Sequence, residues 1–267
     1  MDEVTLRRWP AIERGVGPPI VLLHGYPLTH AMWQPQLESL APDRRVVLLD
    51  LPGYGLAEEW TVPTTLAGFA ESVSQTLAAE LAGPAVIVGH SFGGYVALQM
   101  YRDHPEQFVG LVLTSTRSEA DPPDARAARM ATIERLRDPA EHLDIDAVTQ
   151  SLLAPQTWAR RDPIVDLVRA MVGSARSGTV SATLQAIANR PDLTPVLSTL
   201  QVPVLVVWGE ADHLIPPTQT RGMVEHIPRA LGMGIPSAGH LPSLESPEAF
   251  ARAVRQLLAW VGPKPAQ

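Results

Sequence analysis

The chain has 267 residues, of which 45% are hydrophobic and 18% are charged, values that are typical of a globular protein and exclude an intrinsically disordered one. Its formal net charge is −7 and it has no cysteine, which argues against a nucleic-acid partner and excludes a disulfide framework, a thiolate metal site and a cysteine nucleophile. The first residues are acidic and the apolar segments are too short to cross a bilayer, so we expect a cytoplasmic protein with no signal peptide and no membrane partner.

Short apolar runs that end in a Gly- or Asp-containing turn recur along the chain. We expect residues 4–9 to form an antiparallel edge strand. The later runs are nearly continuous in apolar residues, as expected for strands buried on both faces of a parallel sheet. Helical stretches such as residues 65–81 and 92–103 separate them, and this alternation predicts a doubly wound, mostly parallel α/β sheet. The buried runs are residues 19–23, 45–49, 85–88, 109–113 and 203–207, and residues 230–235 are expected to form the last strand.

The alternation of strand and helix stops between residues 117 and 190, where helical patterns separated by prolines replace it. We expect a core domain of residues 1–116 and 191–267, and a helical cap insertion of residues 117–190. The cap would cover the carboxyl edge of the sheet, where open α/β folds bind their ligands. Ordinary surface crossover helices are the alternative. The helical patterns cover residues 124–137, 145–153, 163–175 and 180–188.

The strongest motif is Gly89-His90-Ser91-Phe92-Gly93, which follows a predicted strand and continues into a helical stretch. The pattern G-x-S-x-G in this context is typical of a nucleophile elbow. The turn is so tight that the serine takes a strained backbone conformation, and the positions two before and two after it have no room for a side chain. Ser91 is therefore the candidate nucleophile. The alternative is a glycine-rich turn that only joins strand to helix.

The sequence His24-Gly25-Tyr26-Pro27 follows the first of the buried strands. Acyl-transfer sites of this layout take one oxyanion donor from the residue after the nucleophile and another from the loop after an earlier strand. We therefore expect the backbone N–H groups of Phe92 and Tyr26 to form the oxyanion hole, and His24 to be structural. The alternative is a simple strand exit in which Tyr26 is a surface aromatic residue.

A serine hydroxyl needs a base that takes its proton, and the base needs a carboxylate that orients it. In this layout the acid lies between the serine and the histidine in chain order. The turn after the predicted strand at 203–207 contains Asp212 and, two residues earlier, its rival Glu210. We prefer Asp212, which lies at the tip of the loop. Glu119 and Asp121 are more distant alternatives.

The candidate base is His240, which lies in the loop after the last predicted strand. A helix follows this loop, and Ser246-Pro247 marks its start because Ser caps helices and Pro is favoured at the first helical position. The chain has eight histidines. Only His240 combines a position after the acid with a loop at the correct edge of the sheet, so we expect the others to be structural.

Five segments together resemble the α/β-hydrolase superfamily of serine esterases, and within it small bacterial carboxylesterases and enol-lactonase-like enzymes. The resemblance covers nearly the whole chain outside residues 117–190. It implies the α/β-hydrolase fold, a triad of Ser91, Asp212 and His240, two oxyanion donors and a helical cap. One departure is Ala57, at a position where many relatives carry a serine. The segments are residues 24–33, 50–55, 89–94, 208–212 and 238–240.

These residues predict a serine hydrolase that cleaves a small-molecule carboxylic ester through an acyl-enzyme. No metal and no cofactor is expected, because the sequence has no metal-ligand spacing and no nucleotide-binding motif. The alternatives are a lactonase or enol-lactonase, a C–C hydrolase with perhydrolase side activity, and a ligand receptor of the same fold. No motif contains an obvious arginine clamp, which favours neutral esters. The expected apolar pocket is lined by Tyr26, Trp33, Phe92, Met130, Leu136, Leu152, Leu214 and Leu241.

Overall fold

The computed structural model describes residues 10–262 and contains one seven-stranded sheet in the order β1-β3-β2-β4-β5-β6-β7. Strand β1 (Ala11–Arg14) runs antiparallel to β3 (Arg45–Leu49), and all other neighbouring strands are parallel. The mostly parallel α/β sheet is thus confirmed. The edge strand expected at residues 4–9 lies outside the described residues. The other strands are β2 (Pro19–Leu23), β4 (Ala85–His90), β5 (Phe108–Thr114), β6 (Val204–Gly209) and β7 (Ala230–Ile235).

The inner strands are apolar along their whole length because both of their faces are covered. In β2, Ile20 and Leu22 belong to one hydrophobic cluster, whereas Val21 and Leu23 belong to the cluster on the other face. Successive side chains of a strand point to opposite faces. A continuous apolar run therefore supplies both layers of the core, which is why the strands could be recognised without an alternating pattern.

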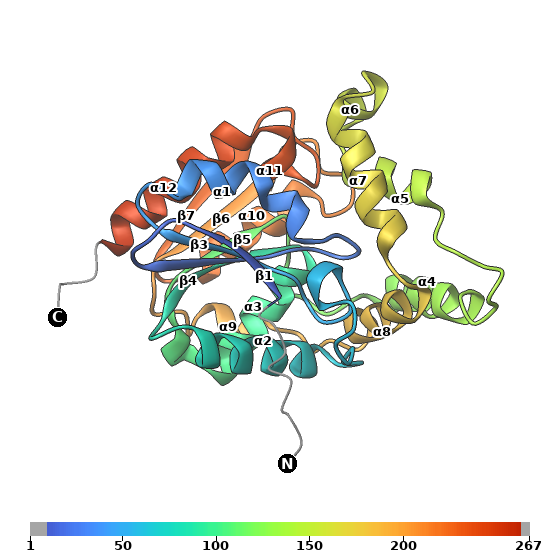
Figure 1. Ribbon diagram of the computed structural model, residues 1–267, viewed down its shortest axis with the longest axis horizontal. Helices are drawn as coiled ribbons and strands as arrows, with labels where there is room; N and C mark the ends of the chain where they lie inside the picture. The colour runs from blue at the N-terminus through green and yellow to red at the C-terminus, as the bar shows by residue number, and fades with distance from the viewer. Residues whose placement is uncertain (1–9, 263–267) are drawn as a thin grey trace, which may run out of the picture.

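Helices cover both faces of the sheet (Figure 1). Helices α1 (Gln34–Leu40) and α12 (Pro247–Val261) lie together on one face, and α2 (Leu66–Glu80) packs beside α3 (Phe92–Asp103) on the other. None of the described helices is both long and apolar enough to cross a membrane. Shorter helices complete the layers: α9 (Thr194–Leu197), α10 (Pro217–Gly222), α11 (Pro242–Glu245) and the 3-10 turns His30–Trp33, Gly55–Ala57, Pro105–Gln107 and Met223–His226.

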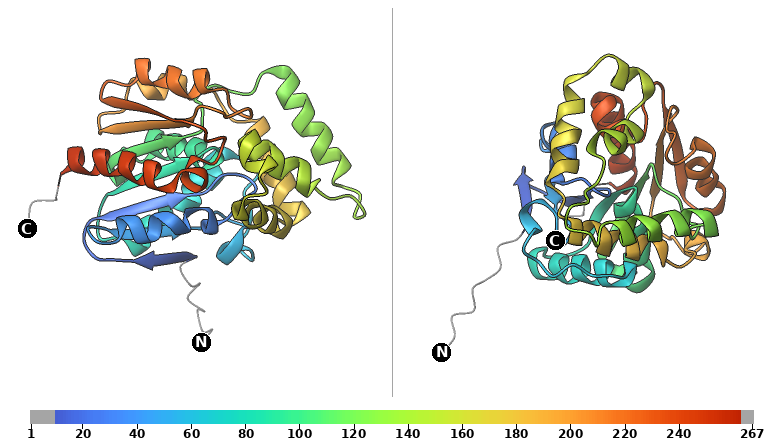
Figure 2. Two further views of the ribbon diagram at one scale, coloured as in Figure 1. Left: turned by 90° about the horizontal axis from the view of Figure 1, so that it is seen from above. Right: turned by 90° about the vertical axis from the view of Figure 1, so that its right-hand side faces the viewer.

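The helices between β5 and residue 190 lie together at one end of the sheet (Figures 1 and 2). Proline stands at the first position of three of them, where its missing N–H costs no helical hydrogen bond. The side chain of Asp144 caps the start of another by accepting from Ala147 N at 2.9 Å. These helices are α4 (Pro123–Arg135), α5 (Ile145–Leu152), α6 (Pro155–Ala159), α7 (Pro163–Ser174) and α8 (Ser177–Ala188).

The two ends of this helical segment meet each other. Leu193 N donates a hydrogen bond of 2.9 Å to Ser118 O, and the hydroxyls of Ser118 and Thr194 lie 3.0 Å apart. The segment therefore leaves the sheet after β5 and returns to the same place before it enters β6, which is the neighbour of β5. The sequence predicted four of its helices to within a few residues and missed the short α6.

Candidate active site

Ser91 occupies a sharp turn between β4 and α3. Its backbone has φ 49° and ψ −113°, a strained conformation for a residue with a side chain. Hydrogen bonds on both sides hold the turn: Ser91 N donates to Thr114 O at 2.9 Å, and Ser91 O accepts from Thr116 Oγ1 at 2.8 Å and from Gly94 N at 2.9 Å. The strain is therefore imposed by the sheet and by the helix that follows.

The glycines of the motif are required by close backbone contacts. A Cβ atom on Gly89 would lie 2.5 Å from Gly93 O, and a Cβ atom on Gly93 would lie 2.5 Å from Leu23 O. The latter atom belongs to the end of β2, so the turn packs directly against the next strand. On Gly25, a Cβ atom would approach the Cβ atom of Ser91 to 3.2 Å. The loop after β2 therefore lies against the turn that carries Ser91.

His240 and Asp212 form a buried pair. His240 Nδ1 lies 2.8 Å from Asp212 Oδ2, and both side chains are fully buried. The other oxygen, Asp212 Oδ1, accepts from Leu214 N at 2.9 Å and from Ile215 N at 3.0 Å. A carboxylate accepts only, so Nδ1 carries the proton and Nε2 of the neutral ring has a free lone pair. Nε2 has no hydrogen-bond partner among the described residues.

The loops that carry the acid and the histidine are packed together. Ala211 N donates to Ala238 O at 2.8 Å, and a Cβ atom on Gly209 would lie 2.0 Å from Gly239 O. Glu210, the rival acid, points elsewhere: its Oε1 accepts from the indole Nε1 of Trp208 at 2.8 Å. Of the two carboxylates in this loop, Asp212 is thus the one that contacts a histidine.

His90 connects the turn at residue 91 to His240. Its Nε2 lies 2.8 Å from His240 O, and the two rings meet edge to face with their centroids 4.8 Å apart. A carbonyl oxygen only accepts, so the proton of His90 is on Nε2. Burial, with a contribution from His240, holds the pKa of His90 well below its ordinary value. His90 is therefore a neutral ring that holds the backbone of His240 beside the elbow.

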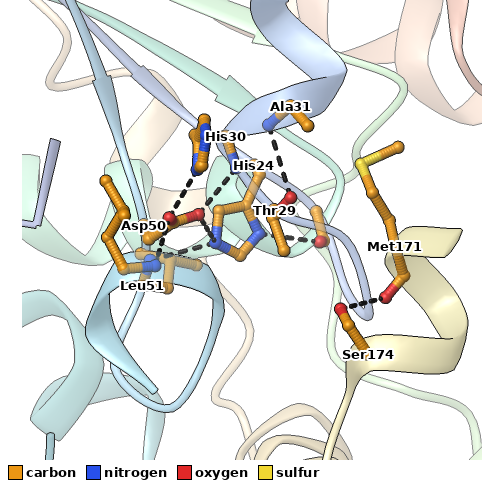
Figure 3. A network of polar contacts seen from close by, with 10 residues as sticks. His24, Thr29, His30, Ala31, Asp50, Leu51, Met171 and Ser174 are labelled. Carbon is orange, nitrogen blue, oxygen red and sulfur yellow. Dashed lines mark hydrogen bonds and ion pairs between the residues drawn. The ribbon is translucent and has the colours of Figure 1, made fainter. Parts of the chain in front are cut away.

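His24 anchors the loop after β2 in a similar way (Figure 3). Its Nε2 accepts from Leu51 N at 2.9 Å, so its proton is on Nδ1, which lies 3.0 Å from Gly25 O. Burial lowers the pKa of His24, in keeping with a neutral ring. Beside it, His30 contacts Asp50 through its backbone N and its Nδ1, each at 2.6 Å. Burial by itself would raise the pKa of Asp50, but the contacts with His30 and His24 bring it below its ordinary value.

The two residues expected to supply the oxyanion donors, Tyr26 and Phe92, line the cavity that contains Ser91. Phe92 is the first residue of α3, and the amides of a first helical turn have no acceptor within the helix. Tyr26 follows Gly25 in the loop that contacts Ser91. Tyr26, Ser91 and Phe92 all line one cavity of about 150 Å³.

The structure places the residues expected in the pocket in three different environments. Leu152 and Leu214 line the cavity. Met130 is 40% exposed, and Leu136 packs with Ile133 in a small cluster of the helical segment. Trp33 and Leu241 are fully buried in the core on the α1 and α12 face. Among the described residues the full lining is Tyr26, Pro27, Ser91, Phe92, Tyr95, Arg117, Arg129, Val148, Ser151, Leu152, Ile187, Leu214 and Ile215.

Two arginines of this lining did not emerge from the sequence, which pointed to neutral esters. Arg117 directly follows Thr116 after β5, at the same edge of the sheet, so its place in the topology could have revealed it. Arg129 lies in α4, and no sequence pattern distinguishes it from the other arginines of that helix. No group of three or more His, Asp or Glu residues in the described part of the chain could hold a metal ion.

Glu245 joins the helical segment to the loop of His240. Its Oε1 accepts from Gly239 N at 2.8 Å, and its Oε2 accepts from Ala154 N at 2.9 Å and from Thr157 Oγ1 at 2.7 Å. Burial raises the pKa of Glu245, although these hydrogen bonds oppose the shift. Gly239 immediately precedes His240, so the position of the imidazole depends on this carboxyl group. No motif in the sequence points to this role of Glu245.

Comparisons with known proteins show which family the chain belongs to. The model of the alpha/beta hydrolase family matches residues 20–253. A pimeloyl-[acyl-carrier protein] methyl ester esterase from Neisseria meningitidis is 31% identical, covering 91% of this chain and 94% of the relative. The enzyme with the same name from Nitrosomonas europaea is 30% identical, covering 88% of this chain and 94% of that one.

Solved structures give the same result. A thermophilic esterase from Thermogutta terrifontis, solved with malate bound, has a TM-score of 0.88 and 33% identity, covering 94% of this chain and 93% of its own. An enol-lactonase from Burkholderia xenovorans shares the fold with a TM-score of 0.85 and 23% identity, covering 93% of this chain and 95% of its own. This chain therefore belongs to the alpha/beta hydrolase family and is an enzyme of its esterase type.

Proposed function

We propose that this enzyme hydrolyses small carboxylic esters through an acyl-enzyme on Ser91, with His240 as the base and Asp212 as the residue that orients it. The observation that carries the proposal is the 2.8 Å contact between His240 Nδ1 and Asp212 Oδ2, because it leaves the lone pair of Nε2 free. A serine hydroxyl becomes a useful nucleophile only when such a base takes its proton.

In the first half of the proposed reaction, Ser91 Oγ attacks the ester carbonyl carbon while His240 Nε2 takes the hydroxyl proton. Negative charge develops on the carbonyl oxygen, and the N–H groups of Tyr26 and Phe92 stabilise it, each by roughly 3 kcal/mol as in other acyl-transfer enzymes. The imidazolium gives its proton to the leaving alcohol as the C–O bond breaks. Asp212 stabilises the imidazolium and stays ionised.

In the second half, water attacks the acyl-enzyme with the same base and the same oxyanion donors. We propose that the helical segment of residues 117–190 acts as a cap domain on a core of residues 1–116 and 191–267, and limits the entry of water. In support, six residues from position 117 to position 187 line the cavity that contains Ser91. Excluding bulk water strengthens the electrostatic stabilisation of the oxyanion.

The substrates named for the relatives guide the choice of test compounds. The relatives from Neisseria and Nitrosomonas are named for a methyl ester, so methyl esters belong in the test panel beside p-nitrophenyl esters of increasing acyl length. The cavity volume of about 150 Å³ favours short acyl groups. A few lactones in the same panel would measure the ester preference directly.

Replacement of the nucleophile tests the proposal. Ser91→Ala should lower kcat for p-nitrophenyl acetate by at least about 10⁴-fold and leave the thermal unfolding temperature near that of the wild type. Ser198→Ala is the matched control, since this exposed serine bonds only to Pro195 O and should keep full activity. Wild-type turnover in Ser91→Ala would refute the proposal. So would a wild-type enzyme that stops after one equivalent of product, because a ligand receptor behaves in that way.

A further inference from the structure

The wall of the Ser91 cavity contains an excess of positive charge. The buried carboxylate of Asp121 contacts three guanidinium groups: Arg117 Nη2 at 2.5 Å, Arg129 Nε at 2.7 Å and Arg190 Nη1 at 2.8 Å. Burial by itself would raise the pKa of Asp121, but Arg129 and Arg190 bring it below its ordinary value, so the group is ionised. Three cations and one anion leave two positive charges uncompensated within this cluster.

One of the three arginines, Arg190, bonds within the protein through both terminal nitrogens, and its buried Nε has no partner among the described residues. The side chain of Arg190 is completely buried and donates to Ile187 O at 3.0 Å and to Glu119 O at 2.7 Å. Its guanidinium also lies over the ring of Tyr95, 4.2 Å from the centroid. Arg190 therefore holds the segment after β5 against the end of α8, and it is not part of the described cavity lining.

The other two arginines have donors to spare, and both line the cavity. Arg129 is 28% exposed and uses only Nε toward Asp121, so its two terminal nitrogens have no partner among the described residues. Arg117 is 13% exposed, its Nη1 donates to Gln219 Oε1 at 3.3 Å, and its Nε is buried without a partner in the described part of the chain. No Asp or Glu is part of the described cavity lining. A buried guanidinium with free donors favours a planar anion such as a carboxylate, which accepts two parallel hydrogen bonds.

We propose that Arg117 and Arg129 form a carboxylate subsite in the Ser91 cavity, and that the preferred substrate is a monoester of a short dicarboxylic acid. This inference rests on the proposed esterase function and specifies its substrate class. A cavity of about 150 Å³ is much larger than a single water requires and has room for an acyl chain of a few carbons. The free carboxylate of the substrate would bind the guanidinium groups and place the ester carbonyl at Ser91.

The reaction itself is ordinary ester hydrolysis. Ser91 Oγ forms a bond to the acyl carbon, methanol leaves with the proton from His240, and water then releases the second carboxylate of the product. Since the product is a dicarboxylate, the same subsite should bind it, and glutarate should inhibit the enzyme competitively. An ester that carries its carboxylate on the alcohol part, such as 3-acetoxypropionate, shows which side of the scissile bond faces the arginines.

The test compares monomethyl glutarate with dimethyl glutarate, which share an acyl chain and differ in one charge. We expect the wild type to prefer the monoester by at least tenfold in kcat/KM. Arg129→Met should reduce this ratio by about tenfold, because only the monoester loses a partner of its carboxylate, and Asp121 keeps two guanidinium partners in this variant. Arg129→Lys should lie between them. The matched control is Arg126→Met on the same helix, whose side chain bonds to Asn189 Oδ1 at 2.9 Å and should leave the ratio unchanged.

The outcomes separate the two proposals. If the Ser91-dependent hydrolysis of the diester is intact but Arg129→Met and Arg117→Met leave the monoester preference unchanged, the subsite is refuted and the esterase function stands. A purely structural role of the arginines would lower the unfolding temperature and slow both substrates equally, which also refutes the subsite. If Ser91→Ala hydrolyses both esters like the wild type, the esterase mechanism fails. Calorimetry of glutarate binding to Ser91→Ala and to Ser91→Ala/Arg129→Met measures the subsite without turnover, and equal affinities would overturn it.

Discussion

The two carboxylates in the loop after β6 have different contacts, and this predicts different effects when each is replaced. Asp212→Asn should lower kcat by about 10⁴-fold, since an amide favours the wrong tautomer of His240 and removes the charge that stabilises the imidazolium. Glu210→Gln should keep kcat within about twofold, because its side chain bonds to the indole of Trp208. Steady-state kinetics with p-nitrophenyl acetate would measure both effects. A comparable decrease in kcat in the two variants would show that Asp212 was wrongly assigned as the acid.

Some residues of the candidate site could be predicted from the sequence and others could not. Gly89, Ser91 and Gly93 were identifiable because a tight turn restricts which residues fit, and Asp212 and His240 followed from chain order and from the edge at which parallel strands end. The helices between residues 117 and 190 have no such restriction. Met130 was expected in the pocket, whereas its neighbour Arg129 lines the cavity. The side chains of adjacent residues point in directions about 100° apart around the helix axis. The sequence does not say how α4 is rotated about its axis, so it does not say which of the two side chains faces the cavity.

At the scale of elements, Glu245 joins α6 and α11 to the loop of His240. Glu245→Ala would leave Gly239 N, Ala154 N and Thr157 Oγ1 without their acceptor, at a cost of roughly 1–3 kcal/mol for each group that stays buried and unpaired. We expect a lower unfolding temperature and a kcat that falls more than KM changes, because the base loses its support.

The matched control for this prediction is Glu248→Ala, on the exposed first turn of α12. It should change neither kcat nor the unfolding temperature by a comparable amount. Circular dichroism melts and ester kinetics measure the two effects separately. Unaltered activity in Glu245→Ala, together with an intact fold, would show that the loop of His240 holds its place without α6.

The strands of the sheet could be predicted far better than the helices between residues 117 and 190. Strands β2 to β6 are buried on both faces, so their sequences are mostly apolar and the pattern of the chain itself indicates them. The helices between residues 117 and 190 are partly exposed and pack against residues far away in sequence. The short α6 illustrates this, since its first residues depend on the carboxylate of Glu245.

At the scale of the whole molecule, two buried neutral histidines make stability depend on pH. Burial lowers the pKa of His24 and of His90 below the ordinary value of 6.5. The unfolded chain therefore binds protons that the folded chain does not, so these groups stabilise the fold above about pH 6.5 and lose that contribution as pH falls. We expect the free energy of unfolding, measured with urea, to decrease from pH 7 to pH 5.

Glu245 acts in the opposite sense and provides a check. Its pKa is raised by burial, so its contribution is present below the pKa of the unfolded state and is lost as pH rises through the folded value. Glu245→Gln removes this titration, and the decrease in stability toward pH 5 should be steeper in this variant than in the wild type. A constant or rising stability in Glu245→Gln between pH 7 and pH 5 would contradict the assignment of neutral His24 and His90.

The position of the helical segment in the chain has a consequence for how such enzymes can diverge. It leaves after β5 and returns before the adjacent β6, and its ends are tied by the bond from Leu193 N to Ser118 O. Because both ends of the segment lie at the junction of β5 and β6, helices of another length could replace it without altering the strand pairing. The loop of His240 limits such an exchange, because Glu245 bonds to Gly239 N of that loop and to Ala154 N and Thr157 Oγ1 of the segment. A replacement segment would therefore have to supply these two contacts again.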